Sequence, residues 1–495
     1  MHTWSRRRFL TRSALAAGAA GLLRPRPAVA AASGGSPNGN VRVAIVGFNG
    51  KGGAHIKAFQ KMSGVTLAAL CDVDSRLLAR GAAELEKNRI KVATYTDYRK
   101  LLESREVDAV VIATPNHWHA LMAIWGCQAG KDVYVEKPVS HNVWEGRKIV
   151  EAARRYGRIV QTGTQSRSDA ALAEAFAEIQ AGKYGRIQWA RGLCYKPRPS
   201  IGKSSGPQLV PSHIDYDLWS GPAPLVPPRR NSSNGTVHYD WHWFWNYGGG
   251  DIANQGIHEM DMCRWVLGEP GLPPAVVSYG GRFGYDDDAE TPNTQVAVYA
   301  YARAPLIFEV RGLPRRTGER AMDAYRGSRV GLVVQCEHAY FAGGAGGGAF
   351  YDAEGKKLKA FSGPGGGEHQ ANFIAAVRSR RESDLAAPIE GGHLSSALCH
   401  LGNISYRLGQ NRDNPAIREA MAGDANAGDS FARMLEHLTA NAVDVNKTPT
   451  VLGPRLALAP GTETFATKER FDAGFWANTM LRRDYRAPYV VPEQV

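Results

Sequence analysis

The tripeptide Glu136-Lys137-Pro138 is the group of residues best suited to chemistry in this chain, and it closes the short apolar run 132–135. A lysine at the end of a buried strand is costly unless it is paired or used. Pro138 keeps Lys137 out of helical geometry and so sets its direction. Successive strand residues point to opposite faces, so Glu136 and Lys137 are expected to serve different tasks. The structural alternative is an exposed Glu–Lys pair in front of a helix.

A second group of chemical side chains follows the three glycines 248–250. The residues after them read as a helix, on which Asn254 and His258 stand four apart and share one face. A histidine beside an amide or carboxylate suits general-base work near neutral pH. Asp251 and Asp261 each stand three positions away from one of these two residues. The structural alternative for His258 is a core histidine with satisfied hydrogen bonds.

A metal site in the same region would have to use His238, His242, His258 and Asp261. The metalloprotease pattern His-Glu-x-x-His is absent, because His258-Glu259-Met260 is followed by Asp261 and Met262. We therefore predict no metal site.

The turn Gly47-Phe48-Asn49-Gly50-Lys51-Gly52 lies between a predicted strand and a predicted helix, as a dinucleotide fingerprint requires. Glycine lets the backbone turn tightly and lets a pyrophosphate approach the end of the helix. The match is imperfect, because the strict pattern has glycine where Asn49 stands, although asparagine tolerates a positive φ. A purely structural turn is the alternative. The candidate cofactor-binding residues here are Gly47, Phe48, Asn49, Gly50 and Gly52.

Asp72 ends the next predicted strand, about twenty residues beyond Gly52, where a carboxylate binds adenosine ribose hydroxyls. Such a carboxylate repels a 2′-phosphate, so the expected cofactor is NAD. NADP is the less favoured alternative, and the nearby Arg76 keeps it open. The structural alternative for Asp72 is a cap for the helix predicted from Ser75.

A third turn, 114–119, supplies Thr114, Pro115, Asn116 and His119. Parallel strands bring their carboxyl ends to one edge of a sheet, where nucleotide cofactors bind. We therefore expect these four residues, together with Glu136 and Lys137, to complete the cofactor site.

The elements that must position these groups alternate between strand and helix from Val41 to about Gly163. The predicted strands are apolar throughout, which indicates a parallel sheet covered on both faces. Further on, runs with period-two character predict an open, largely antiparallel sheet. Gly343–Gly348 and Gly363–Gly367 are predicted loops. The fold class is therefore α/β: an N-terminal Rossmann domain with a doubly wound parallel sheet, followed by an α+β domain.

The predicted domain boundaries follow from these patterns. They are a Rossmann domain over 41–163, an α+β substrate and oligomerisation domain over 164–410, and a C-terminal extension over 411–495. Within the second domain, the stretch 196–247 is rich in aromatic side chains, which stack on sugar surfaces or fill a core. Those side chains are Trp219, Tyr239, Trp241, Trp243, Phe244, Trp245 and Tyr247.

The first 32 residues predict export. Ser5-Arg6-Arg7-Arg8-Phe9-Leu10 matches the twin-arginine pattern, a weakly apolar run follows, and Ala28-Val29-Ala30 offers a cleavage site. We expect a Tat signal peptide over 1–32, a linker over 33–40, a periplasmic or secreted protein, and no stable membrane insertion after the signal is removed. Free nicotinamide cofactor is expected to be scarce at that destination.

Charge and cysteine content narrow the function classes. The net charge of the whole chain is +13. The first 32 residues contain six arginines and no acidic residue, so the rest of the chain has a net charge of about +7. The remaining basic residues are scattered, so no nucleic-acid partner is expected. The six cysteines are well separated and include no Cys-x-x-Cys pair, so neither a disulfide scaffold nor a zinc ribbon is predicted.

Taken together, these motifs resemble the glucose–fructose oxidoreductase, inositol dehydrogenase and rhizopine-catabolism family (Gfo/Idh/MocA). The resemblance rests on Thr114-Pro115-Asn116-x-x-His119, on Glu136-Lys137-Pro138 and on the glycine-led segment that ends in His258 and Asp261. The tail 482–488 is similar to the tails of exported members. The resemblance implies a catalytic Lys137 assisted by an Asp-x-x-x-His pair, of which His258 is present and Asn254 replaces the aspartate. It also implies homo-oligomerisation through the open sheet.

Three functions remain open at this point. The first is an NAD-dependent oxidoreductase that acts on a hydroxyl of a sugar, sugar derivative or cyclitol and holds its cofactor tightly. The second is a glycoside hydrolase or lyase in which NAD is oxidised and reduced within one cycle. The third is a sugar-binding protein that keeps the cofactor fold without catalysis.

Overall fold

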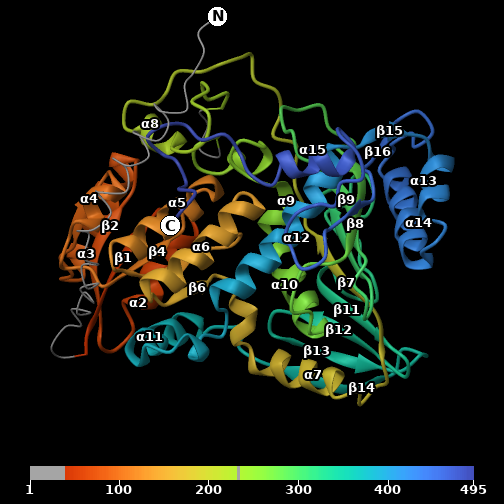
Figure 1. Ribbon diagram of the computed structural model, residues 1–495, viewed down its shortest axis with the longest axis horizontal. Helices are drawn as coiled ribbons and strands as arrows, with labels where there is room; N and C mark the ends of the chain where they lie inside the picture. Colours follow the sequence, from red (N-terminus) through yellow and green to blue (C-terminus); the bar gives the residue numbers. More distant parts are fainter. Residues whose placement is uncertain (1–38, 231–234) are drawn as a thin grey trace, which may run out of the picture. The chain divides into compact units, whose positions relative to one another are not determined.

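Short apolar runs near the start of the described chain form a six-stranded parallel sheet (Figure 1). The computed structural model describes residues 39–230 and 235–495, so the predicted signal peptide and nearly all of the predicted linker lie outside the described residues. The strand order is β3-β2-β1-β4-β5-β6. The strands are β1 Val41–Val46, β2 Val65–Cys71, β3 Ala93–Tyr95, β4 Ala109–Ile112, β5 Asp132–Val135 and β6 Val160–Thr162.

Helices cover both faces of this sheet, and alternate strand residues point to the two sides. Val43 and Ile45 of β1 pack with α2, α3 and α11, whereas Ala44 and Val46 pack in the cluster of α4, α5 and α6. The helices are α2 Lys51–Phe59, α3 Ser75–Lys87, α4 Tyr98–Leu102, α5 Asn116–Gln128, α6 Val143–Tyr156 and α11 His369–Ser379. The strand order and parallel pairing confirm the predicted Rossmann architecture.

The second sheet has eleven strands and is antiparallel except where β10 pairs with β7. Along the sheet the order is β14-β13-β12-β11-β7-β10-β9-β8-β16-β15, and β17 also pairs with β8. The strands are β7 Ile187–Tyr195, β8 Ala275–Gly281, β9 Thr294–Tyr299, β10 Leu306–Arg311, β11 Val330–Cys336, β12 Tyr340–Gly344, β13 Gly347–Tyr351, β14 Lys357–Ser362, β15 Gln410–Arg412, β16 Thr450–Leu452 and β17 Leu456–Ala457. This sheet confirms the largely antiparallel second domain.

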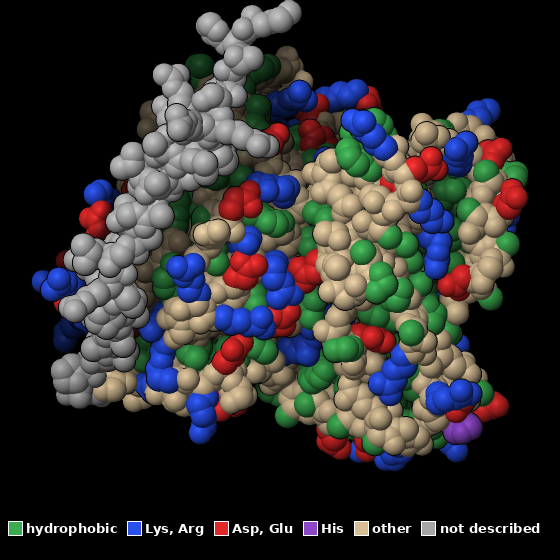
Figure 2. Space-filling view, viewed as in Figure 1, with side chains coloured by type: hydrophobic (Ala, Val, Ile, Leu, Met, Phe, Trp, Pro, Cys, Tyr) green, Lys and Arg blue, Asp and Glu red, His purple; other side chains and the backbone are tan. Residues whose placement is uncertain are grey.

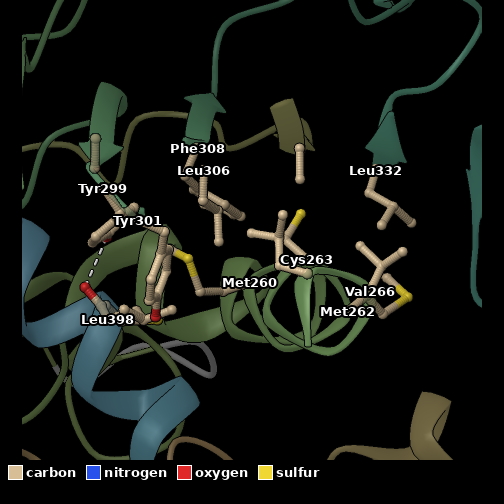
Figure 3. Packing of buried hydrophobic residues seen from close by; sticks show 14 of the residues in the cluster. Met260, Met262, Cys263, Val266, Tyr299, Tyr301, Leu306, Phe308, Leu332 and Leu398 are labelled. Carbon is tan, nitrogen blue, oxygen red and sulfur yellow. Dashed lines mark hydrogen bonds between the residues drawn. The ribbon is translucent and has the colours of Figure 1, made fainter. Parts of the chain in front are cut away.

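Helices α7 (Ala170–Gln180), α10 (Gly256–Leu267) and α12 (Ile389–Arg407) cover one face of the second sheet. Figure 3 shows Met260, Cys263 and Val266 of α10 directed toward strand residues that include Phe308 and Leu332. The Tyr299 hydroxyl donates a 2.7 Å hydrogen bond to the Leu398 carbonyl oxygen. This bond satisfies the one polar group that Tyr299 brings into the core.

Helices α13 (Asn414–Met421) and α14 (Ala425–Ala440) cover part of the opposite face. Phe431 and Met434 of α14 pack on Tyr279 and Val298 of the sheet. The sequence predicts an open sheet face. In the structure, helices of the same chain cover this face over the strands β7, β10, β9 and β8.

Three local predictions differ from the structure. Gly343–Gly348 is not simply a loop, because Gly343 pairs with Gly348 and Gly344 with Gly347 in the hairpin β12–β13. The helix predicted after Gly250 is divided into α9 (Gly250–Asn254) and α10. The turn at 114–119 becomes helical from Asn116, so His119 lies in the first turn of α5. Gly363–Gly367 carries neither helix nor strand, as predicted.

Charged side chains of both signs are interspersed on the described part of the face shown in Figure 2. A surface of this kind is typical of a solvated enzyme and differs from the single-sign stripe that nucleic acids select. Within residues 39–230 and 235–495, no helix combines the length and the apolar character needed to cross a membrane.

Candidate active site

The glycine turn is shaped by close backbone contacts. Gly47 has φ of +74°, and a Cβ on it would lie 2.9 Å from the backbone nitrogen of Thr114. A Cβ on Gly52 would lie 2.0 Å from the Gly47 carbonyl oxygen, so only glycine fits there. Helix α2 starts after Gly50 without a side-chain cap, which leaves its first N–H groups for a ligand. These features fit the pyrophosphate of a dinucleotide.

Asp72 lies at the carboxyl end of β2 and is bound to this turn. Its carboxylate accepts hydrogen bonds from the backbone N–H groups of Phe48 (3.1 Å) and Asp74 (3.0 Å). The cap of α3 is Asp74, which accepts from the N–H groups of Arg76 and Leu77, so Asp72 is not the helix cap. Burial raises the pKa of Asp72 to about 6, against the effect of the two backbone donors. The carboxylate is thus presented at the cavity wall, where a ribose would bind.

His119 ties two of the predicted turns together. Its Nε2 lies 2.7 Å from the Thr114 carbonyl oxygen and its Nδ1 lies 2.7 Å from the Pro138 carbonyl oxygen. The ring is buried, and burial lowers its pKa. His119 therefore holds the start of α5 against the segment that follows Lys137, as a positioning residue.

Glu136 is buried in a polar network below the cavity. Its Oε1 lies 2.9 Å from His55 Nε2 and accepts a 3.0 Å hydrogen bond from Gln165 Nε2. Burial acts to raise the pKa of Glu136, but the contact with His55 and the nearby charges of Lys51 and Lys137 together outweigh it, and the pKa falls well below its usual range. Because His55 belongs to α2, this contact joins the phosphate-facing helix to the end of β5.

Lys137 reaches from the Rossmann domain to the second domain. Its Nζ donates a 2.7 Å hydrogen bond to the backbone carbonyl oxygen of Asn254, and the Lys137–Pro138 peptide is cis. The side chain is half-buried, and burial lowers the pKa of its amine. Lys137 and Glu136 have different partners, in accord with the expectation that they serve different tasks.

His258 and Asn254 face the same cavity from α10 and the end of α9. No described residue makes a hydrogen bond to the ring of His258 or to the side-chain amide of Asn254, so both are free to meet a substrate. Burial, reinforced by the charge of Lys137, lowers the pKa of His258 to about 3. The imidazole is therefore uncharged near pH 7, and its ring nitrogens are open to a hydrogen bond from a substrate hydroxyl.

Asn254 stands where the Asp-x-x-x-His pair would have its aspartate. Neither of the two neighbouring aspartates is free to take over the role of that carboxylate. Asp251 is held by Arg198, with N–O distances of 2.8 and 2.9 Å. Asp261 is held by Arg167, with distances of 2.7 and 2.8 Å, and it also accepts from Ser395. Carboxylates paired with arginine in this way are poor proton carriers.

One cavity of about 370 Å³ brings the predicted residues together. Of the candidate residues named from the sequence, only Gly52 does not line it, because Gly52 packs behind the turn. The lining candidates are Gly47, Phe48, Asn49, Gly50, Asp72, Thr114, Pro115, Asn116, His119, Glu136, Lys137, Asn254 and His258. Among the described residues, no three histidine, cysteine, aspartate or glutamate side chains are arranged to hold a metal ion.

Several cavity residues were missed by the sequence reasoning. Trp118 and Trp125 of α5 line the cavity, and their spacing with Met122 on one helix face was a signal that could have found them. His242 lies against Trp241, with ring centroids 3.6 Å apart, and its pKa falls to about 3 because it is buried. The sequence marked His242 only as a possible metal ligand and not as part of this cavity.

The aromatic stretch divides between cavity and core. Trp219, Tyr239 and Trp241 line the cavity, whereas Trp243 and Phe244 are buried away from it. The wall is completed by α8 (Tyr216–Ser220), to which Leu218 and Trp219 belong.

Comparison with known proteins agrees with this architecture. Residues 41–164 match the family model described as "Oxidoreductase family, NAD-binding Rossmann fold". Residues 187–306 match the model described as "Oxidoreductase family, C-terminal alpha/beta domain". Both are models of the Gfo/Idh/MocA family, and the first confirms NAD as the predicted cofactor.

Curated relatives include proteins of Shewanella named glycosyl hydrolase family 109 protein. One from Shewanella baltica is 39% identical over 120 residues, which make up 23% of this chain and 26% of that protein. Another, from Shewanella sp. strain ANA-3, is 38% identical over the same length. The matching segment thus spans about a quarter of the length of these relatives.

Solved structures share the fold. The WlbA dehydrogenase from Bordetella pertussis, solved with NADH and UDP-GlcNAcA, has a TM-score of 0.55 at 20% identity, covering 74% of this chain and 97% of that one. Levoglucosan dehydrogenase, solved with NADH and levoglucosan, has a TM-score of 0.56 at 16% identity, covering 73% of this chain and 96% of that one. At these identities the likeness shows the fold alone. Over residues 41–164 and 187–306, this chain is thus similar to the Gfo/Idh/MocA family of NAD-binding oxidoreductases.

Proposed function

We propose that the chain is an NAD-dependent oxidoreductase that acts on a hydroxyl group of a sugar, sugar derivative or cyclitol. The observation that carries this proposal is the meeting of Lys137 and His258, a cation and a neutral base, in the cavity that also contains the glycine turn and Asp72. The stacking surfaces of Trp219 and Trp241 in the same wall suit the C–H faces of a sugar ring.

The residues divide the work of the reaction. His258 accepts the hydroxyl proton on its imidazole, which is neutral near pH 7. Lys137 donates a hydrogen bond to the same oxygen and stabilises the negative charge that develops there. When bound, NAD supplies hydride acceptance at the carbon that carries this oxygen. Asn254 orients a neighbouring hydroxyl through its free amide, which cannot carry a proton.

We also propose that the protein is exported by the twin-arginine route and holds its cofactor tightly. The twin-arginine pattern at Ser5–Leu10 supports export. If free cofactor is scarce outside the cytoplasm, hydride has to be returned to a second substrate without cofactor release. The covering of the cavity by α8 and the aromatic stretch is consistent with slow release.

The second candidate is an NAD-dependent glycoside hydrolase or lyase, and the names of the Shewanella relatives favour it. In that reaction, transient oxidation of a sugar hydroxyl acidifies the neighbouring C–H, the glycosidic group leaves, and the oxidation is then reversed. Lys137 and His258 would serve the oxidation step in both candidates.

The test begins with denaturation of the purified protein and mass spectrometry of the released nicotinamide. The intact protein is then incubated with sugars, cyclitols and aryl glycosides. Net change in NADH supports the oxidoreductase, and glycoside cleavage without net change supports the second candidate. Sugar binding without any turnover, or the absence of bound and bindable NAD, contradicts both.

Lys137→Ala is the decisive variant. It should lower turnover by about 10²-fold or more while NAD still binds, because it removes a charge aimed at the reacting oxygen. Lys87→Ala, at an exposed position on α3, is the matched control and should retain full activity. Equal turnover in Lys137→Ala and the control would refute the assigned role.

A further inference from the structure

Glu259 is a buried carboxyl group without a counter-ion. It follows His258 in the first turn of α10, and only 3% of it is exposed. Its Oε1 accepts a 3.0 Å hydrogen bond from Gln255 Nε2, whereas its Oε2 is buried with no hydrogen-bond partner among the described residues. Within the same described ranges, no lysine, arginine or histidine forms an ion pair with it. A buried carboxylate left in this way is unstable, so the group has a reason to hold a proton.

The location of Glu259 links it to Lys137. The residue that hydrogen-bonds Glu259 is Gln255, and the preceding residue, Asn254, accepts the hydrogen bond of Lys137 Nζ. Burial raises the pKa of Glu259 to about 8, and the charge of Lys137 opposes that rise. Conversely, burial lowers the pKa of Lys137, and the charge of Glu259 opposes that fall. The charge of each group therefore acts on the other.

Other charged groups around this pair are accounted for. Glu136 also raises the pKa of Lys137, whereas Lys51 and Lys196 lower it. Lys196 Nζ donates a 2.7 Å hydrogen bond to Gln255 Oε1, which orients the Gln255 amide toward Glu259. Asp251 raises the pKa of Glu259, although its own charge is matched by Arg198.

The remaining titratable groups near Glu259 are thiols of the surrounding elements. They are Cys194 on β7, Cys263 on α10 and Cys399 on α12, and burial raises the pKa of each. These thiols carry no charge near neutral pH. Lys137 is thus a cation that lowers the pKa of Glu259, and Glu259 and Glu136 are carboxylates that raise the pKa of Lys137.

We propose that Glu259 is a positioning residue that controls the charge of Lys137. As a carboxylate it favours the proton on Nζ, and as a neutral acid it withdraws that support. Unlike Asp251 and Asp261, it has no arginine partner in the described part of the chain, so its charge is free to change. Its importance for turnover rests on the proposed function, but its effect on Lys137 does not.

The test measures the protonation of Lys137 directly. Purified protein freed of cofactor is labelled briefly with acetic anhydride over a range of pH, and acetylation of Lys137 is followed by peptide mass spectrometry. In Glu259→Gln the labelling midpoint should shift to lower pH, and labelling near pH 8 should become several times faster. Glu84→Gln, at an exposed ion pair on α3, is the control and should leave the midpoint unchanged.

A second measurement needs no variant. The infrared carbonyl band of a protonated carboxyl should be present in the wild-type protein at neutral pH and should disappear as the pH rises through about 8. Identical Lys137 midpoints in wild type and Glu259→Gln, or no such band, would overturn the proposal. If Glu259→Gln does not fold, the wild-type band decides. Neither measurement uses NAD or a sugar, so a failure here is distinct from a failure of the proposed function.

Discussion

Asp72 combines two requirements that oppose each other. To accept hydrogen bonds from ribose hydroxyls it must be ionised, yet burial raises its pKa to about 6 and so favours the protonated form. Because the pKa is higher in the folded protein than in an unfolded chain, protonation below about pH 6 stabilises the fold. The same protonation removes an acceptor from the cofactor site. Stability and cofactor affinity should therefore respond to acid in opposite directions at this residue.

We predict that NAD affinity falls as the pH drops through about 6, approaching tenfold per pH unit below that value. The measurement is calorimetric or fluorescence titration of NAD between neutral and mildly acidic pH. Asp72→Asn should bind NAD more weakly at neutral pH and should lose this pH dependence. Asp97→Asn, which removes a helix-capping carboxylate near the cavity, is the control and should keep it. An unchanged profile in Asp72→Asn would exclude Asp72 as the titrating group.

At the scale of elements, the candidate site was accessible to sequence reasoning because parallel strands end at one edge. Gly47, Asp72, Thr114 and Glu136 follow β1, β2, β4 and β5, and strand order alone brings them together. The residues that were missed come from elsewhere. The place of His242 in the cavity depends on how residues 216–220 and 235–245 pack around it, and no local periodicity encodes that arrangement.

The errors in element prediction have physical causes. Glycine is depleted in strands, so 343–348 resembled a loop, but backbone pairing of Gly343 with Gly348 needs no side chain. The break at Gln255 between α9 and α10 leaves the spacing of Asn254 and His258 unchanged. A hydrophobic pattern cannot reveal such a break, because both helices keep their buried faces.

The C-terminal tail holds the cavity wall in place. Arg486 Nε donates to the Gly221 carbonyl oxygen at 3.0 Å, and its two terminal nitrogens donate to the side chain and backbone of Asp217 at 2.5 and 2.7 Å. Asp217 belongs to α8, whose Leu218 and Trp219 line the cavity. The tail segment 482–488 therefore acts as a brace for α8.

We predict that Arg486→Ala loosens α8 and accelerates NAD release by about fivefold, which corresponds to about 1 kcal/mol for a partly exposed group of hydrogen bonds. Hydrogen exchange of residues 216–221 should rise in parallel. Arg482→Ala, in the same tail but paired with the exposed Glu493, is the matched control and should change neither quantity. Faster exchange without faster release would show that α8 does not retain the cofactor.

At the scale of the whole molecule, α13 and α14 occupy the part of the second sheet that was expected to bind another subunit. Their apolar side chains pack on the strands, and Glu309 of β10 is held by Arg191 and by Arg433 of α14. Oligomerisation remains a prediction, and any subunit contact has to use a surface other than this covered one. The covered area also makes α14 important for solubility, because its removal would expose a broad apolar sheet face.

Phe431 is the anchor that should report on this arrangement. It is fully buried, and its ring meets Tyr279 edge to face at 5.5 Å. Phe431→Ala should lower the free energy of unfolding by about 3–5 kcal/mol, because it leaves a cavity between α14 and the sheet. It should also promote self-association in light scattering, as the sheet face becomes intermittently exposed. Phe471→Ala, at a side chain that is 52% exposed, should cost less than about 0.5 kcal/mol. Phe431→Ala could instead unfold more easily and yet show no more self-association than the control. That result would mean that α13 and α14 do not cover a surface prone to association. Subunit association through this face of the sheet would then be excluded, even when α14 is loosened.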